Sequence, residues 1–216
     1  MSKTFVLIHG AGDVGWSWHL VEERLRRHGH DVVAPDLPCD EDGAGLDDYV
    51  ATVERAIGDR DDLVVVGQSF GGFTATLLVG RRPVQALVFV SAMIPAPGES
   101  AEDWFVTTGW EAALGGADLS DPFVAYYHDV PRALAEEAMA RERDQSATPG
   151  KTPFPLDALP DVRTRFVLCT EDRFFPPAFM RPVVADRLGT TPDEIAAGHC
   201  APLSRPDELA TILLDA

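Results

Sequence analysis

Short, continuous apolar runs alternate along the chain with longer segments of mixed polarity. The apolar runs lack the polar–apolar alternation of a half-exposed strand, so each is predicted to be a strand buried on both faces. The six predicted strands are Thr4 to Ile8, Asp31 to Ala34, Leu63 to Val66, Gln85 to Val90, Arg165 to Cys169, and Pro192 to Ile195. Strands of this kind with helices between them predict an α/β fold, in which a mainly parallel six-stranded sheet carries helices on both faces.

Between the strands, apolar residues recur at intervals of three and four, as on one face of a helix. Trp18, Val21 and Leu25 form one such face, and the segment from Leu46 to Ile57 carries another. Further helices are predicted at Phe73 to Val79, Ala133 to Arg143, and Pro177 to Leu188. A last helix is predicted after Ser204, whose hydroxyl would cap it in a capping box with Asp207.

The pattern changes between residues 95 and 160, where aromatic residues and helix breakers accumulate. Trp104, Trp110, Tyr126 and Tyr127 lie in this stretch. Long irregular insertions in a compact domain are typically lids or binding segments. The sequence therefore predicts an α/β core formed by residues 1–94 and 161–216 and a helical lid formed by residues 95–160. The alternative is a small helical subdomain with no role in binding.

Length and charge restrict the classes of partner. The chain has 216 residues, enough for one well-filled domain, and a net charge of −17 that disfavours nucleic acid and anionic membranes. Three widely spaced cysteines match no zinc site or disulfide framework, and the first apolar run is too short for a signal peptide or a membrane span. We expect a cytoplasmic monomer or homodimer that acts on a small molecule, with no metal or organic cofactor.

The most informative motif is Gly67-Gln68-Ser69-Phe70-Gly71, between a predicted strand and a predicted helix. It matches the nucleophile elbow G-x-S-x-G, in which a sharp turn exposes a serine hydroxyl next to the first amides of a helix. The flanking glycines are needed because a Cβ at either position would collide with the neighbouring strand or helix. An ordinary glycine-rich turn is the alternative interpretation.

A serine hydroxyl needs a base to accept its proton, and the base needs an acid to orient it. In this architecture both partners follow Ser69 in loops after later strands. His199 follows the last predicted strand and is the candidate base, whereas His128, in the predicted lid, is its rival. The candidates for the acid are Asp172, its neighbour Glu171, and Asp129.

The segment His9-Gly10-Ala11-Gly12 follows the first predicted strand and could supply an oxyanion hole. The expected donors are the backbone amides of Ala11 and Phe70. A dinucleotide-binding loop is the alternative, because glycines also stand at positions 10, 12 and 15 and Asp36 could serve as the ribose-binding acid. The serine elbow, followed in order by an acid and a histidine, favours the hydrolase interpretation.

Nearly the whole chain resembles the α/β-hydrolase superfamily, and within it small bacterial esterases related to plant methyl esterases and hydroxynitrile lyases. The segments that carry the resemblance are Val6–Ala11, Gly15–Trp18, Ala34–Pro38, Gly67–Gly72, Thr170–Pro176 and Gly198–Pro206. By position, the resemblance implies a catalytic triad of Ser69, Asp172 and His199, and so favours Asp172 as the acid. It also implies oxyanion amides at Ala11 and Phe70.

Two positions depart from the hydroxynitrile lyases of this family. Gly10 stands where they have a threonine and Cys200 where they have a lysine, so nothing obvious would stabilise a cyanide leaving group. We therefore predict a serine hydrolase that acts on a small to medium apolar ester, or a thioester. The predicted pocket residues are His9, Trp104, Trp110, Tyr126 and Tyr127. The alternatives are a lyase, eliminase or cyclase of small-molecule biosynthesis on the same scaffold, and a non-catalytic ligand receptor.

Overall fold

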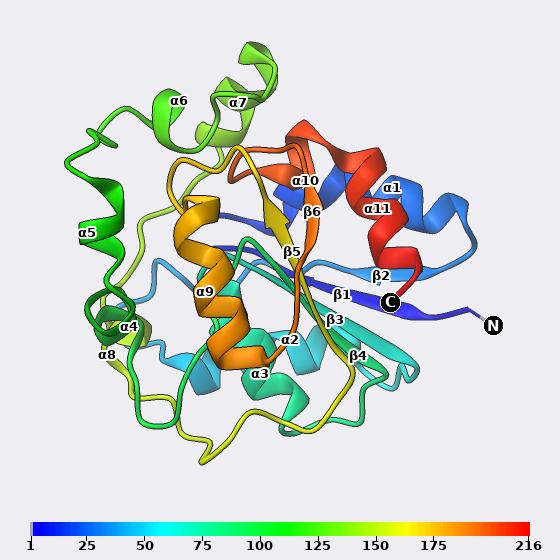
Figure 1. The fold of residues 1–216 in the computed structure, drawn as a ribbon. Coiled ribbons are helices and arrows are strands. Elements are labelled where there is room, and N and C mark those ends of the chain that lie inside the picture. The colour runs from blue at the N-terminus through cyan, green and yellow to red at the C-terminus, as the bar shows by residue number, and fades with distance from the viewer. Residues whose placement is uncertain (1) are drawn as a thin grey trace.

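The computed structural model describes residues 2–216 and contains one six-stranded sheet (Figure 1). The strands are β1 (Thr4–Ile8), β2 (Asp31–Val33), β3 (Leu63–Gln68), β4 (Ala86–Val90), β5 (Thr164–Cys169) and β6 (Asp193–Ile195). They lie in the order β2-β1-β3-β4-β5-β6, and every neighbouring pair is parallel. The predicted α/β fold and its six strands are confirmed, with small shifts at the strand ends.

Helices of the core connect these strands. They are the 3-10 helix η1 (Gly15–Trp18) and the α-helices α1 (His19–Arg27), α2 (Leu46–Ile57), α3 (Gly71–Val79), α9 (Pro177–Leu188), α10 (Ala201–Ser204) and α11 (Pro206–Leu214). Each helix within the described residues 2–216 is too short or too polar to cross a lipid bilayer.

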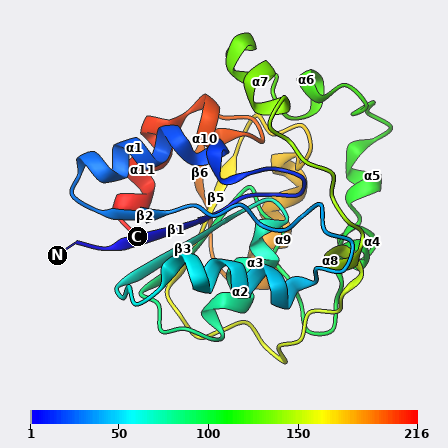
Figure 2. The same ribbon diagram turned by 180° about the vertical axis from the view of Figure 1, so that it is seen from behind.

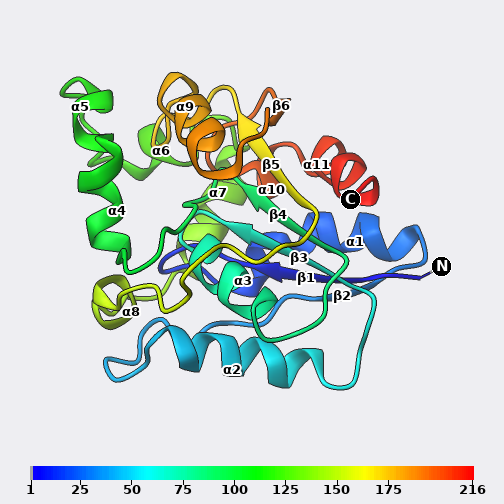
Figure 3. The same ribbon diagram turned by 60° about the horizontal axis from the view of Figure 1, so that its bottom comes forward.

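The helices cover both faces of the sheet, which explains why the strands are continuously apolar. In β1, Phe5 and Leu7 pack against α1 and α11, whereas Val6 and Ile8 belong to the core that also contains α2, α3 and α9. Figures 2 and 3 show α1 and α11 on one side of the sheet and α2 and α3 on the other. Because successive side chains of a strand point to opposite faces, every position of β1 is buried.

Residues 95–160 are called the lid segment below. They carry α4 (Ala101–Thr108), α5 (Trp110–Leu114), α6 (Pro122–Ala125), α7 (Arg132–Met139) and α8 (Thr148–Lys151). Figures 1 and 2 show these helices gathered at the end of the sheet that is opposite to the two chain termini. Since all strands run away from the N-terminal edge, this is the end where the carboxyl ends of the strands open into loops.

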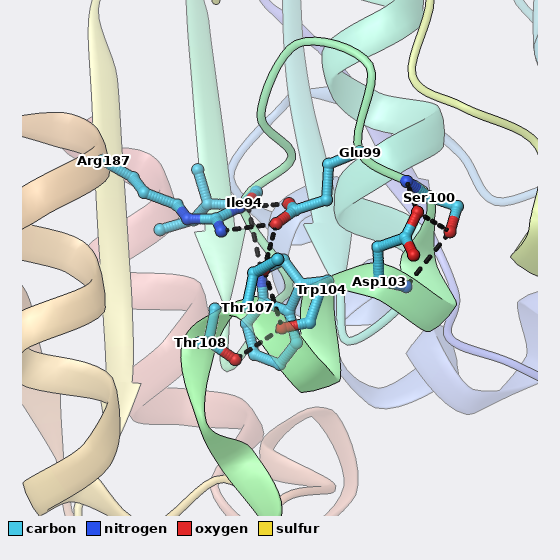
Figure 4. A network of polar contacts seen from close by, with 8 residues as sticks. All are labelled: Ile94, Glu99, Ser100, Asp103, Trp104, Thr107, Thr108 and Arg187. Carbon is cyan, nitrogen blue, oxygen red and sulfur yellow. Dashed lines mark hydrogen bonds and ion pairs between the residues drawn. The ribbon is translucent and has the colours of Figure 1, made fainter.

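A buried ion pair attaches the lid segment to the core (Figure 4). Arg187, near the end of α9, binds both carboxylate oxygens of Glu99 at 2.5 and 2.8 Å and the carbonyl of Ile94 at 2.5 Å. The Thr107 hydroxyl of α4 also donates to Glu99. The side chains of Arg187 and Glu99 are only 13% and 7% exposed, so the ion pair that joins the start of the lid segment to α9 is largely shielded from water.

Two helix ends differ from the prediction. Ser204 ends α10 instead of capping α11, whose cap residue is Arg205, and the buried Ser204 hydroxyl has no partner among the described residues. The residue after that cap, Pro206, starts α11, since a first-turn proline lacks only an N–H that the helix does not use. Helix α7 ends at Met139 rather than Arg143, because the chain turns there toward the loop after β1.

Candidate active site

Ser69 lies at the apex of the turn between β3 and α3, with a φ of +52° that non-glycine residues rarely adopt. Neighbouring glycines allow this turn. A Cβ on Gly67 would lie 2.7 Å from the carbonyl oxygen of Gly71, and a Cβ on Gly71 would lie 2.5 Å from that of His9. Gly72 is equally constrained, because its Cβ would lie 2.1 Å from the carbonyl oxygen of Met93. The elbow therefore has the backbone geometry that its motif requires.

The structure brings Ser69, His199 and Asp172 together in series. The Ser69 hydroxyl lies 3.0 Å from His199 Nε2, and His199 Nδ1 lies 2.8 Å from Asp172 Oδ2. A carboxylate can only accept, so Nδ1 carries the imidazole proton and Nε2 is left to accept from the serine. The three side chains come from loops after β3, β5 and β6, at the common edge where those strands end.

The Asp172 carboxylate is buried and fully bonded. Its Oδ1 accepts from the backbone amides of Phe174 and Phe175, each at 2.8 Å, and its Oδ2 accepts from His199 and from the Ser91 hydroxyl. These four donors hold the carboxylate in place beside the imidazole. Sequence reasoning missed Ser91, although its place directly after β4, beside the strand that leads to Asp172, was an available signal.

Aromatic rings surround the imidazole. The rings of Phe174, Phe175 and Tyr126 have centroids 5.2, 5.3 and 5.6 Å from that of His199. His199 itself is 4% exposed. A dry surrounding of this kind strengthens the hydrogen bonds of the Ser–His–Asp series.

The rival residues lie beside this series and not in it. His128 Nε2 lies 3.0 Å from the carbonyl oxygen of Glu171, and Asp129 Oδ2 accepts from the amide of Gly198 at 2.7 Å. Among the described residues, the side chains of His128, Asp129 and Glu171 make no hydrogen bond to Ser69 or to the imidazole of His199.

Ala11 and Phe70 line a cavity beside Ser69. Within residues 2–216, neither backbone amide donates to another group of the chain, so both remain available to an oxygen in the cavity. The loop packs closely against the elbow at position 10. A Cβ on Gly10 would lie 2.7 Å from Gln68 Oε1 and 3.0 Å from the Cβ of Ser69.

His9, predicted in the pocket, instead holds the loop that carries Ala11. Its Nδ1 lies 2.8 Å from the carbonyl oxygen of Gly10, and its Nε2 accepts from the amide of Leu37 at 2.9 Å. Both ring nitrogens are thus used by the backbone, and the side chain lies outside the cavity lining. Burial lowers the pKa of His9 to about 4, which fits an imidazole that must stay neutral to accept at Nε2.

Asp36 likewise has a structural contact. Its Oδ1 accepts from the amide of Gly15 at 2.7 Å. Gly15 in turn packs so closely against Ala34 that a Cβ would lie 2.1 Å from the carbonyl oxygen of Ala34. Gly15 therefore serves a tight backbone crossing, and Asp36 is bound by the backbone of this loop rather than placed to bind a ribose.

The cavity has a volume of about 400 Å³ and opens beside Ser69 and His199. Tyr126 and Tyr127 line it, whereas Trp104 and Trp110 do not. Trp104 is fully buried, and its indole donates to the carbonyl of Ile94 at 3.1 Å. Trp110 donates to the carbonyl of Phe174 at 2.6 Å and packs behind the lining.

Phe105 is an aromatic lining residue of α4 that sequence reasoning missed. Successive helical residues point about 100° apart, so the burial of Trp104 turns Phe105 toward the cavity. Without the packing partners of α4, nothing in the sequence chooses between these two adjacent aromatic residues.

One side of the cavity is polar. Asp13, Glu142 and Arg143 line it there. Burial raises the pKa of Asp13 to about 6, with a hydrogen bond from the amide of Val14 opposing the shift. Among the described residues, no three His, Cys, Asp or Glu side chains are arranged to hold a metal ion.

Comparison with known proteins shows the family to which the chain belongs. The sequence pattern of the alpha/beta hydrolase family matches residues 5–212. Methylesterase 7 of Arabidopsis thaliana is 27% identical over 250 residues, covering 99% of this chain and 95% of the relative. Norfluorocurarine synthase 1 of a Strychnos species is 24% identical over 251 residues, covering 98% and 94%.

A solved structure shows the same fold. The crystal structure of polyneuridine aldehyde esterase superposes with a TM-score of 0.84, covering 100% of this chain and 99% of that chain at 24% identity. The chain therefore belongs to the alpha/beta hydrolase family and is an enzyme related to the plant methylesterases.

Proposed function

We propose that this protein is a carboxylic ester hydrolase that acts through a covalent acyl-enzyme on Ser69. The observation that carries the proposal is the unbroken series from the Ser69 hydroxyl through His199 to Asp172, with contacts of 3.0 and 2.8 Å. A serine that donates to a neutral, carboxylate-bound imidazole is the arrangement that nucleophilic acyl transfer requires.

In this proposal Ser69 Oγ attacks the ester carbonyl while His199 Nε2 accepts the hydroxyl proton. Asp172 keeps Nδ1 protonated and stabilises the imidazolium that forms. The amides of Ala11 and Phe70 bind the oxygen on which negative charge develops. His199 then returns the proton to the leaving alcohol. Water, activated by the same imidazole, attacks the acyl group and releases the acid.

The cavity supports an ester with a small to medium apolar group. Its volume of about 400 Å³ is in the range of small-molecule sites, and Met93, Phe105 and Phe174 give it apolar walls. We propose that the lid segment forms the substrate-facing wall through Phe105, Tyr126 and Tyr127. Gly10 and Cys200 supply no side-chain cation for a cyanide leaving group, which favours ester hydrolysis over cyanohydrin cleavage.

Purified protein is expected to hydrolyse short-chain nitrophenyl esters, and Ser69→Ala is expected to lower kcat by up to about a million-fold, as when a triad is disabled. A fluorophosphonate probe should label the parent at Ser69 and leave the variant unlabelled. Ser120→Ala, at an exposed serine of the lid segment, is the matched control and should keep full activity. Undiminished hydrolysis by Ser69→Ala would reject the mechanism.

A second candidate is lyase or related non-hydrolytic chemistry on the same scaffold. It draws support from the relative named as a norfluorocurarine synthase. In that case His199 would take a proton from carbon and Ser69 would form no acyl intermediate. Turnover of a carbon acid that survives Ser69→Ala but is lost in His199→Ala would favour this candidate over the esterase.

A further inference from the structure

Two adjacent residues of the lid segment bind both loops that carry the histidine and the acid of the proposed triad. His128 and Asp129 lie between α6 and α7. His128 Nε2 contacts the carbonyl oxygen of Glu171 at 3.0 Å, and Asp129 Oδ2 accepts from the amide of Gly198 at 2.7 Å. Glu171 directly precedes Asp172 in the sequence, and Gly198 directly precedes His199.

The two loops are otherwise joined by backbone contacts that continue the pairing of β5 with β6. The amide of Thr170 donates to the carbonyl of Ile195 at 2.9 Å, and that of Glu171 donates to the carbonyl of Ala197 at 3.0 Å. This pairing stops before Gly198. The carboxylate of Asp129 therefore binds the first amide beyond it, at the point where the chain leaves the sheet to place His199.

Close packing shows that this contact is built into the loop. A Cβ on Gly198 would lie 2.5 Å from Asp129 Oδ1 and 2.8 Å from His128 Nε2, so a larger residue at position 198 would displace both side chains. Asp129 Oδ1 is itself buried and has no hydrogen-bond partner within the described chain. A buried carboxylate oxygen without a donor is costly, and the bond from the Gly198 amide to Oδ2 offsets part of that cost.

We propose that Asp129, assisted by His128, is a positioning residue that fixes the backbone of the His199 loop against the Asp172 loop. This inference rests on the proposed function, because it assigns the dipeptide to the alignment of the triad. The lid segment then does more than cover the cavity. It holds the imidazole at the distance from Ser69 and Asp172 that proton transfer needs.

The test compares Asp129→Ala with Asp129→Asn in nitrophenyl ester hydrolysis. Asp129→Ala removes the acceptor for the Gly198 amide and should lower kcat by about tenfold to a hundredfold, since small displacements of reacting groups have effects of that order. KM should stay within about twofold, because the cavity wall is intact. Asp129→Asn keeps an acceptor oxygen and should restore kcat to within about threefold of the parent.

Proton NMR reports on the hydrogen bond of His199 to Asp172, which a loss of overall stability alone would not change. The low-field signal of the His199 Nδ1 proton should shift or broaden in Asp129→Ala while the melting temperature stays near that of the parent. Asp144→Ala, at an exposed aspartate of the same segment, is the matched control and should change neither quantity.

Two results would overturn the proposal. One is a folded Asp129→Ala enzyme with kcat within about twofold of the parent, and the other is an Asp129→Asn enzyme as slow as Asp129→Ala. If Asp129→Ala does not fold, His128→Ala decides instead: a lower kcat at constant KM supports the proposal, and unchanged kcat overturns it. Ser69→Ala in the same assay separates this outcome from failure of the hydrolase mechanism itself.

Discussion

The cavity has two walls of different origin. One consists of loops at the ends of the core strands, which contribute Ser69, Phe70, His199 and the Gly10–Asp13 segment. The other is the lid segment, which contributes Phe105, Tyr126 and Tyr127 among others. Ser69 and His199 of the proposed triad lie on the first wall, where the parallel sheet fixes the spacing of the loops. Three of the five Phe and Tyr residues that line the cavity lie on the second.

The two walls are held in place by different interactions. The core wall is held by strand pairing, whereas the lid segment is a series of short helices held by individual contacts such as Glu99 with Arg187. The lid segment also forms hydrogen bonds directly with the core wall. The amide of Arg143 donates to the carbonyl of Gly12 at 2.7 Å, and Gln145 Oε1 accepts from the amide of Gly12 at 3.0 Å. Changes to the core wall should therefore alter chemistry or stability, and changes to the lid should alter substrate binding unless they reach these contacts.

The largest expected effect on stability concerns the ion pair that joins the two regions. Glu99→Ala leaves the guanidinium of Arg187 buried without its counter-ion and should lower the free energy of unfolding by about 3–5 kcal/mol. Urea denaturation measures this. Glu136→Ala, which breaks the exposed Arg132–Glu136 pair on α7, is the matched control and should cost less than about 1 kcal/mol. Equal losses in the two variants would show that the buried pair does not anchor the lid segment.

A somewhat smaller effect on stability is expected from protonation of His9, which holds the Gly10–Asp13 segment of the core wall from behind. Its pKa is about 4 in the folded protein, against an ordinary value of 6.5, so the unfolded chain binds the proton more readily between these values. The free energy of unfolding should therefore fall as pH decreases from 6.5 to 4, by about 3 kcal/mol from this residue. Protonation would also remove the acceptor for the amide of Leu37.

Denaturation curves at several pH values check this prediction. His9→Gln should lose less stability than the parent across that window, whereas the exposed His28→Gln should follow the parent. Asp13 opposes the trend, because its raised pKa of about 6 favours the folded state as pH falls below that value. Asp13→Asn should therefore steepen the acid loss. Parallel curves for His9→Gln and the parent would contradict the role given to this imidazole.

The smallest effect is expected on the lid wall. Phe105→Ala should raise KM for apolar esters by about tenfold, because it removes apolar contact area worth roughly 1–2 kcal/mol, and should leave kcat nearly unchanged. Steady-state kinetics on a series of esters of increasing chain length measures both. Val106→Ala, at a neighbouring side chain that is 81% exposed, is the control. A fall in kcat at constant KM in Phe105→Ala would mean that the lid wall takes part in the chemistry.

The sequence determined the α/β fold, because buried parallel strands must be apolar on both faces and β1, β3 and β4 carry that pattern without interruption. It also indicated Ser69 and His199, since an elbow needs its glycines and a strand-end loop places a histidine at the site. Only tertiary structure decided which neighbours complete the site. Packing decided that Phe105 rather than Trp104 faces the cavity, and that His9 supports a loop instead of lining the cavity. It also placed Ser91 beside Asp172. Each outcome depends on contacts between segments far apart in the chain, which local sequence propensity does not encode.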